Sequence, residues 1–202
     1  MAFSSSTVIS GQVTKKSDYD RLMNNTVHIL RSATTFTGAK TFTSTISAND
    51  GITVPVMHVQ EQMAVGTSPG GLTANTWTKR TLNTELTNTI TGSSLSSGQI
   101  TLPTGTYKIN AAAPGYNINR HSIRIYNTSD SVIELSGVGD YMANTGGIIN
   151  IVGIITVVGN KIFELQHACQ TTNSTNGMGL SMNAYFSVPY ETYTDVFIEK
   201  LA

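Results

Sequence analysis

The chain has 202 residues, of which only 12 % are charged, and its twelve basic residues balance its twelve acidic ones. This length allows one hydrophobic core of ordinary size with an extension, and the lack of a basic excess argues against a nucleic-acid-binding protein. Low charge with abundant Thr, Ser, Asn and Gly favours β structure with extensive contact between subunits, because an isolated chain needs surface charge to stay dispersed.

The first 56 residues predict three segments that precede a globular domain. Residues 1–14 form a polar arm, in which no basic region followed by an apolar run provides a secretory signal. Residues 15–32 predict a helix, because Asp18 and Asp20 suit its first turn and apolar side chains recur at helical spacing. Residues 33–56 predict a β connector that three chains wound together could stabilise. The alternatives are a helix and a linker that both lie on the globular domain.

The clearest strands lie within residues 99–127. Apolar side chains alternate with polar ones along the first, at Tyr107, Ile109, Ala111 and Ala113. We expect Pro114 and Gly115 to end this strand. A second strand from about Ser122 to Tyr126 places Ile123 and Ile125 on one face. Two such strands need a further sheet to cover their shared apolar face.

Similar alternation predicts the other strands of an antiparallel sandwich. They cover His58–Met63, Val132–Leu135 with Ile133 and Leu135 inward, Lys161–Gln170 with Phe163, Leu165, His167 and Cys169 on one face, and Tyr193–Leu201. Gly159-Asn160 predicts a tight hairpin turn. A further apolar face is shared by Met178, Leu180, Met182, Ala184 and Phe186.

The stretch from Ile148 to Val158 is apolar on both of its predicted faces. An antiparallel sandwich normally leaves one face of each strand in water. This strand is therefore expected to be covered twice, once by its own core and once by another subunit. It is too short to cross a bilayer, so no membrane insertion is expected.

Several segments resemble one known family. The stretches GTYKINAAAPGYNINRHSIRIYN, KIFELQHACQTT and ETYTDVFIEKL, with Trp77, Arg80 and Leu82-Asn83, resemble a C-terminal domain common in bacteriophage tail fibres and adsorption proteins. The resemblance runs from about His58 to Leu201. It implies that residues 57–202 form a head domain, a trimeric jelly roll of the complement-globular-head and tumour-necrosis-factor type.

The beginning of the chain carries a second, shorter resemblance. Gly11, Val13, Asp18, Tyr19 and Asn24 follow a pattern similar to the opening of many phage fibre proteins, which leads into a short helix near the virion attachment end. The residues of this helix that would attach to other virion proteins are Tyr19, Leu22, Met23, Ile29 and Leu30.

The resemblance implies a structural virion fibre protein of a tailed bacteriophage, made in the host cytoplasm. It would form a homotrimer and mediate host adsorption by binding a cell-surface receptor, such as a glycan. The alternative is a head fibre, a capsid decoration or a tail adaptor protein that binds other virion proteins alone. A third hypothesis, an unrelated trimeric adhesion or signalling module of the same fold, requires export, for which the sequence shows no signal.

Receptor contact is expected from loops within residues 114–119, 141–147 and 171–177, because aromatic and amide side chains suit sugar binding. The candidate receptor-facing residues are Tyr116, Asn117, Asn119, Tyr141, Asn144, Asn173 and Asn176. The candidate trimer contacts are Trp77, Arg120, His121, Ile149, Ile151 and Ile155. For Arg120, a structural role across a subunit contact is preferred to binding of a charged receptor group.

No pattern in the sequence indicates an enzyme or a cofactor. The chain lacks the Gly-x-Ser-x-Gly and His-Glu-x-x-His motifs, and its four histidines have no ligand-like spacing. His121 and His167 could approach each other across neighbouring strands, with Cys169 nearby. For His167, which has apolar neighbours on its predicted face, a buried, hydrogen-bonded histidine is preferred to a ligand or an acid/base group.

Overall fold

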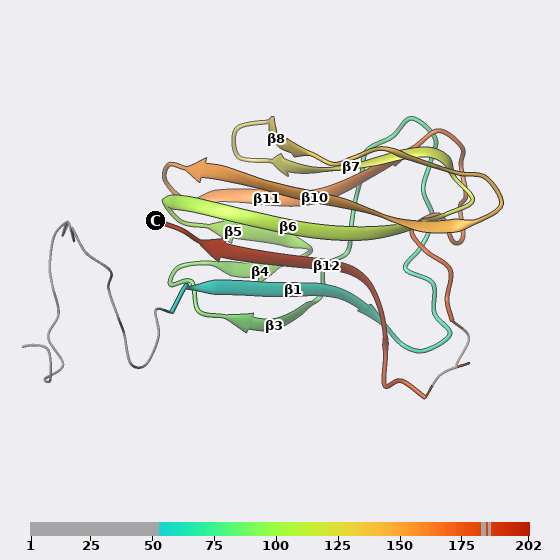
Figure 1. The fold of residues 1–202 in the computed structure, drawn as a ribbon, viewed down its shortest axis with the longest axis horizontal. Coiled ribbons are helices and arrows are strands. Elements are labelled where there is room, and N and C mark those ends of the chain that lie inside the picture. Colours follow the sequence, from blue (N-terminus) through green and yellow to red (C-terminus); the bar gives the residue numbers. More distant parts are fainter. Residues whose placement is uncertain (1–52, 183–184, 186) are drawn as a thin grey trace, which may run out of the picture. The chain divides into compact units, whose positions relative to one another are not determined.

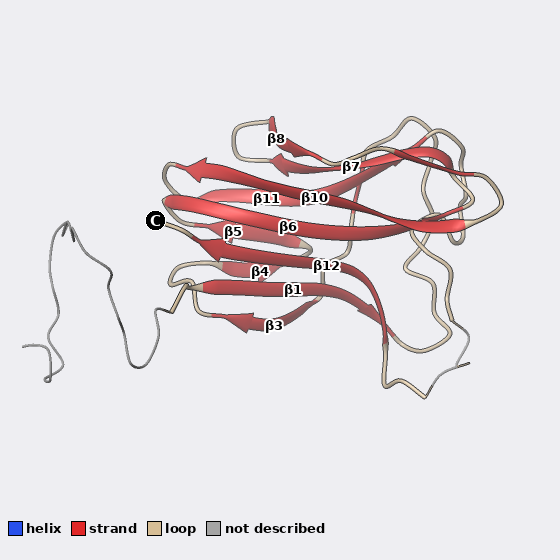
Figure 2. Cartoon of the chain, viewed as in Figure 1, coloured by secondary structure: helices blue, strands red, loops and turns tan. Residues whose placement is uncertain are grey.

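The computed structural model describes residues 53–182, 185 and 187–202 (Figures 1 and 2). Every regular element in this part of the chain is a β-strand. The strands are β1 (Val56–Met63), β2 (Thr78–Lys79), β3 (Thr84–Asn88), β4 (Ser94–Ser96), β5 (Gln99–Leu102), β6 (Gly105–Tyr116), β7 (Asn119–Asn127), β8 (Val132–Ser136), β9 (Asp140–Met142), β10 (Gly146–Val157), β11 (Lys161–Cys169) and β12 (Glu191–Lys200). Within the same residues, no helix could span a membrane.

The strands form two antiparallel sheets. The first sheet has the order β10-β6-β12-β1-β3, and the second has the order β4-β5-β11-β7-β8, with β2 also paired to β11 and β9 also paired to β7. Along the chain, the sheet changes between β1 and β2, β2 and β3, β3 and β4, β5 and β6, β6 and β7, β9 and β10, β10 and β11, and β11 and β12. This alternation between two packed antiparallel sheets is a jelly-roll sandwich, which confirms the predicted fold class.

Strand β6 lies between β10 and β12 and shows why the alternating pattern folds this way. Its inward residues Tyr107, Ile109, Ala111 and Ala113 are all buried, whereas Lys108 and Asn110 between them are exposed. Successive side chains of a strand point to opposite faces, so a period of two yields one core face and one outer face. The sequence prediction for this strand is confirmed.

One large apolar cluster fills the space between the sheets. The first sheet contributes Ile109, Ile151 and Val196, and the second contributes Ile123 and Leu165, each at most 2 % exposed. A smaller cluster contains Cys169 at the end of β11 and three residues from the loops after β1, β6 and β11, which are Leu72, Ile118 and Met178. Burial of these side chains is the main stabilising contribution to the sandwich.

Two expectations about strand ends are wrong. Strand β6 continues through Pro114 and Gly115 to Tyr116, with Pro114 paired to Ile148 of β10. The pairing of β6 with β12 ends at Ala112, so the missing N–H of Pro114 faces no partner strand. Gly159 does turn the chain, with a φ of 74°, but it connects β10 in the first sheet to β11 in the second and therefore closes no hairpin.

Two further expectations about side-chain direction are wrong. The register between β7 and β8 pairs Ile125 with Leu135 and Tyr126 with Ile133, which leaves Glu134 as the extra residue of a β-bulge. The bulge interrupts the alternation, so Leu135 packs against the core while Ile133 is 51 % exposed. Past β11, Met178 is buried but the predicted apolar face does not form, since Leu180 and Met182 are 50 % and 40 % exposed.

Some predictions concern residues outside the described part of the chain. These are the arm (1–14), the helix (15–32) with Tyr19, Leu22, Met23, Ile29 and Leu30, most of the connector (33–56), and the positions of Ala184 and Phe186.

Replacing Ile109 by alanine should lower the free energy of unfolding by about 2–5 kcal/mol, because the truncation leaves a cavity at the centre of β6. The matched control is Leu86→Ala on β3, where the side chain is 47 % exposed and the change should stay within about 0.5 kcal/mol. Urea unfolding at one fixed protein concentration measures both. Equal losses in the two variants would contradict the described core.

Candidate functional site

The two ends of the sandwich differ in what they carry. The start of β1 and the C-terminus lie at one end, on the left in Figure 1. The opposite end, which we call the loop end, carries the segments 114–119, 141–147 and 171–177, so the three loops predicted to contact a receptor lie together.

Backbone hydrogen bonds tie these three loops to one another. The Asn117 N–H donates to the Thr145 carbonyl (2.9 Å), the Ile118 N–H to the Met142 carbonyl (3.2 Å), and the Thr171 N–H to the Ile118 carbonyl (3.1 Å). The loop end is therefore one connected surface built from distant parts of the sequence.

Asparagines shape the turns of this surface. Asn117, Asn119 and Asn144 have φ values of 50°, 57° and 57°, in the left-handed region that asparagine tolerates better than most residues. Asn117 Oδ1 accepts from the Asn144 N–H (3.0 Å), Asn119 Nδ2 donates to Thr171 Oγ1 (2.8 Å), and Asn173 Nδ2 donates to the Tyr116 carbonyl (3.0 Å). These amides hold the loops in place.

The candidate receptor-facing residues therefore divide into two groups. Tyr141 is 57 % exposed, and Asn117 and Asn144 are also exposed. The others, each only half-buried, are Tyr116, Asn119, Asn173 and Asn176. Asn173 Oδ1 accepts from the Asn176 N–H (3.0 Å), so this pair stabilises its own loop.

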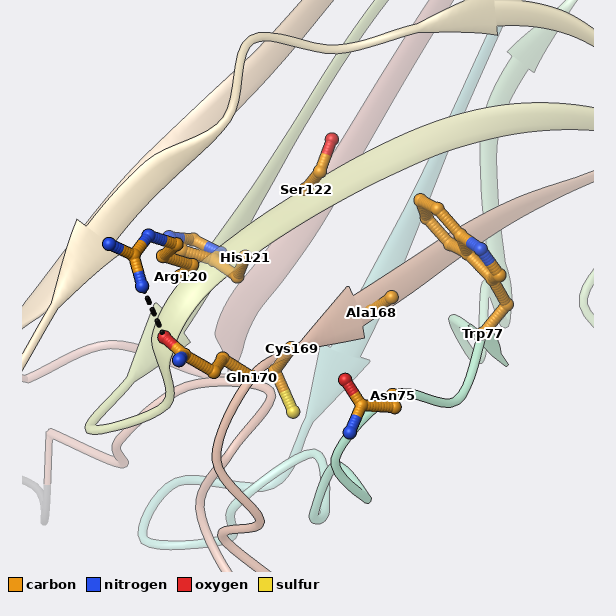
Figure 3. A pocket seen from close by; sticks show the side chains of 8 residues that line it. All are labelled: Asn75, Trp77, Arg120, His121, Ser122, Ala168, Cys169 and Gln170. Atoms are coloured by element: carbon orange, nitrogen blue, oxygen red, sulfur yellow. Dashed lines mark hydrogen bonds between the residues drawn. The ribbon is translucent and has the colours of Figure 1, made fainter.

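An open pocket of about 540 Å³ lies beside the loop end on the outer side of the second sheet (Figure 3). It is lined by Asn75, Trp77, Arg120, His121, Ser122, Ala168, Cys169 and Gln170, and we call it the Trp77 pocket. The cross-strand pair of Ser122 and Ala168 lies between two pairs with longer side chains. These are Arg124 with Gln166, joined by a hydrogen bond of 2.9 Å, and Arg120 with Gln170, joined by one of 3.1 Å.

Trp77 flanks this pocket. The indole is 39 % exposed, and the guanidinium of Arg124 lies 4.2 Å from its ring centre, within the range of a cation–π contact. On the other side of the pocket, Arg120 is exposed and lies 6.0 Å from the ring centre of Tyr141. Figure 3 shows Trp77 and Arg120 on opposite sides of Ala168.

A chain of buried polar side chains connects the two sheets in the interior of the sandwich. Arg80 and Glu61 are both fully buried and form an ion pair in which Arg80 Nη2 lies 2.6 Å from Glu61 Oε2. Thr194 Oγ1 donates to Glu61 Oε2 (2.8 Å). Arg80 Nη1 also donates to the Met178 carbonyl (3.0 Å) and lies 3.5 Å from Nδ1 of His167.

The same chain continues from His167 to His121, where His167 Nε2 lies 2.9 Å from His121 Nδ1. Arg80 can only donate, so His167 Nδ1 accepts and the His167 proton is on Nε2. His121 Nδ1 then accepts, and the neutral His121 ring carries its proton on Nε2, which has no hydrogen-bond partner among the described residues. Burial lowers the pKa of His167 to about 2, with the nearby Arg80 and His121 contributing in the same direction.

The outer face of β10 exposes the apolar side chains of Ile148, Val152 and Ile154, at 64 %, 68 % and 60 %. The candidate trimer contacts on this strand need correction. Ile149, Ile151 and Ile155 point into the core of their own chain and are at most 5 % exposed, because they have the opposite parity along the strand.

Among the other candidate trimer contacts, Trp77 and Arg120 flank the pocket, and His121 is 4 % exposed, with its ring against His167. His121 is therefore not available to a second subunit. For His167, the buried, hydrogen-bonded position preferred from the sequence is confirmed. Within those residues, no group of three or more His, Cys, Asp or Glu side chains could hold a metal ion.

The burial of Arg80 and Glu61 was not predicted from the sequence. Glu61 has the same strand parity as the buried Met57 and Val59, so a carboxylate on an apolar face was the available indication. Arg80 follows the two-residue strand β2, which is too short to show a periodicity.

No protein-family model matches this chain, and no curated protein matches it. Solved structures with a similar fold include the globular domain of zebrafish complement 1qA protein, at 13 % identity over 74 % of this chain and 98 % of that chain, with a TM-score of 0.49. Eiger TNF from S. frugiperda matches at 10 % identity over 74 % and 93 %, with a TM-score of 0.48. The PRD1 vertex protein P5 matches at 17 % identity over 75 % and 100 %, with a TM-score of 0.44. At these identities and TM-scores, the similarities assign neither a family nor a function.

The stability of the protein should fall as the pH is lowered below about 6.5. A histidine whose pKa is depressed in the folded state binds its proton more readily in the unfolded chain. For His167 the loss begins near the ordinary histidine pKa, grows as the pH falls toward the folded value of about 2, and amounts to about 2 kcal/mol by pH 5. Urea unfolding between pH 7.5 and 5 measures it.

The matched variant is His167→Gln, whose amide can still accept from Arg80 and donate to His121 but does not titrate. The slope of its free energy of unfolding against pH should be smaller than the wild-type slope by the contribution of about one bound proton. An unchanged slope would show that the pH dependence arises elsewhere.

Proposed function

We propose that this chain is a structural virion protein of a tailed bacteriophage, a homotrimeric fibre protein that mediates host adsorption by binding a cell-surface receptor. The observation that carries the proposal is that the start of β1 and the C-terminus lie at the opposite end of the domain from the three hydrogen-bonded loops. A domain attached through the end that holds the start of β1 presents its loop end outward.

The outer face of β10 supports self-association. Exposed β-branched side chains at Ile148, Val152 and Ile154 flank Ala112 and the half-buried Phe197 on the same face of the first sheet. Clustered exposed apolar side chains of this kind mark interaction sites. The same face also carries the ion pair of Lys108 with Glu199, and Lys108 lies opposite Ile154. A second copy of the chain is the partner that supplies a matching apolar surface.

The loop end supports binding rather than chemistry. The amides of Asn117, Asn119 and Asn173 are used to fix the loops, which makes a pre-organised surface with exposed Tyr141 and Asn144. In a trimer each weak contact is repeated, so overall affinity can exceed that of one site.

Light scattering should give a mass close to three times 21.6 kDa for the full-length protein. Val152→Asp should shift this mass toward the monomer, because it places a charge on the apolar outer face of β10. The control is Val132→Asp on β8 in the second sheet, which is 45 % exposed and should remain trimeric. A monomeric wild type at all concentrations would contradict the trimer.

Fluorescently labelled full-length protein should bind saturably to cells of some strains in a panel of bacteria. The double variant Tyr141→Ala and Asn144→Ala should bind these cells at least tenfold more weakly, a loss of about 1.4 kcal/mol or more in apparent binding free energy. Val132→Asp should bind these cells as the wild type does. Binding to no strain, with retention on purified virions, would instead favour a head fibre, decoration or adaptor protein and overturn the adsorption role.

A further inference from the structure

The Trp77 pocket has a definite structural origin. Ser122 and Ala168 form its centre as a directly opposed cross-strand pair, and their side chains are the shortest on this part of the outer face. The pairs on either side carry arginines and glutamines, and Trp77 rises beside them. A volume of about 540 Å³ falls within the range of small-molecule sites.

The side chains at this pocket offer two kinds of contact. Trp77 provides an aromatic surface held in place by Arg124, which lies over its ring. Asn75, Ser122 and Gln170 provide amides and a hydroxyl that can both donate and accept hydrogen bonds. An aromatic ring beside amide and hydroxyl groups suits a pyranose sugar, whose C–H face is apolar and whose rim carries hydroxyls.

The positive charge of Arg120 at the pocket favours a ligand that carries a negative charge. The lining residues include the guanidinium of Arg120 and no carboxylate. Arg120 is exposed and makes one side-chain hydrogen bond, from Nη1 to Gln170 Oε1. Its remaining N–H donors can form the bidentate pair that a guanidinium makes with a carboxylate.

We propose that the Trp77 pocket binds a pyranose sugar that bears a carboxylate, as a residue of a surface glycan. The sugar ring stacks on Trp77, its carboxylate pairs with Arg120, and its hydroxyls bond to Asn75 and Gln170. This inference rests on the proposed function, since it names the chemistry of the receptor and the place where it binds.

Trp77 is the only tryptophan of the chain, so intrinsic fluorescence of the full-length protein reports on this pocket directly. The probes are methyl β-D-glucuronide, galacturonic acid and N-acetylneuraminic acid, with methyl β-D-glucoside and sodium acetate as the neutral and charge-only controls. At least one acidic sugar should change the Trp77 emission saturably, at a concentration at least tenfold below any effect of the two controls.

Two variants test the contacts. Arg120→Ala should weaken binding of that sugar at least tenfold, and Arg120→Lys should also weaken it, because an ammonium cannot form the bidentate pair. The matched control Lys108→Ala removes one positive charge from the outer face of β6 in the first sheet and should bind as the wild type does. Far-ultraviolet circular dichroism verifies that each variant is folded.

The inference is overturned if no acidic sugar in the panel changes the emission, if the glucoside or acetate has the same effect, or if Arg120→Ala responds as the wild type does. Failure of the proposed function looks different, since it is read on whole cells. Labelled protein that binds cells equally well with and without Arg120→Ala supports adsorption and rejects this pocket.

Discussion

The buried ion pair of Arg80 and Glu61 is the constraint on which the loop end depends. Two charges out of water are stable only when their remaining donors and acceptors are satisfied. Thr194 bonds to Glu61, and the Met178 carbonyl and His167 bond to Arg80. Arg80 thus joins a strand of each sheet to the backbone at Met178.

Strands β7 and β11 contribute residues both to the buried polar chain and to the Trp77 pocket. His121 and Cys169 are buried and form part of the pocket lining, while their neighbours Arg120, Ser122 and Gln170 line it from the outer face. Because successive residues of a strand face opposite ways, the buried contact of His121 with His167 also fixes where the pocket groups stand. The outer site is therefore positioned by the core directly beneath it.

Alternation of apolar residues predicted the fold well where strands are regular, as in β6 and at Ile123 and Ile125 of β7. It failed where one extra residue changes the parity, as the bulge at Glu134 does for Ile133, and where a turn joins different sheets, as at Gly159. The register with β7 decides the first, and the sheet to which each strand belongs decides the second; the alternation within one strand shows neither. The predicted receptor loops do lie together, but the pocket beside them depends on Trp77 meeting β7 and β11, which local patterns do not encode.

The two surfaces with unusual composition lie on opposite sheets. The exposed Ile148, Val152 and Ile154 belong to the first sheet, and the Trp77 pocket belongs to the second. An edge strand with such an outer face favours association with another chain, and β10 is at the edge of its sheet. In the proposed trimer, contact through the first sheet leaves the pocket on the second sheet open in every subunit. Three pockets held at fixed spacing can then bind a repetitive surface tightly, even if a single pocket holds one sugar weakly.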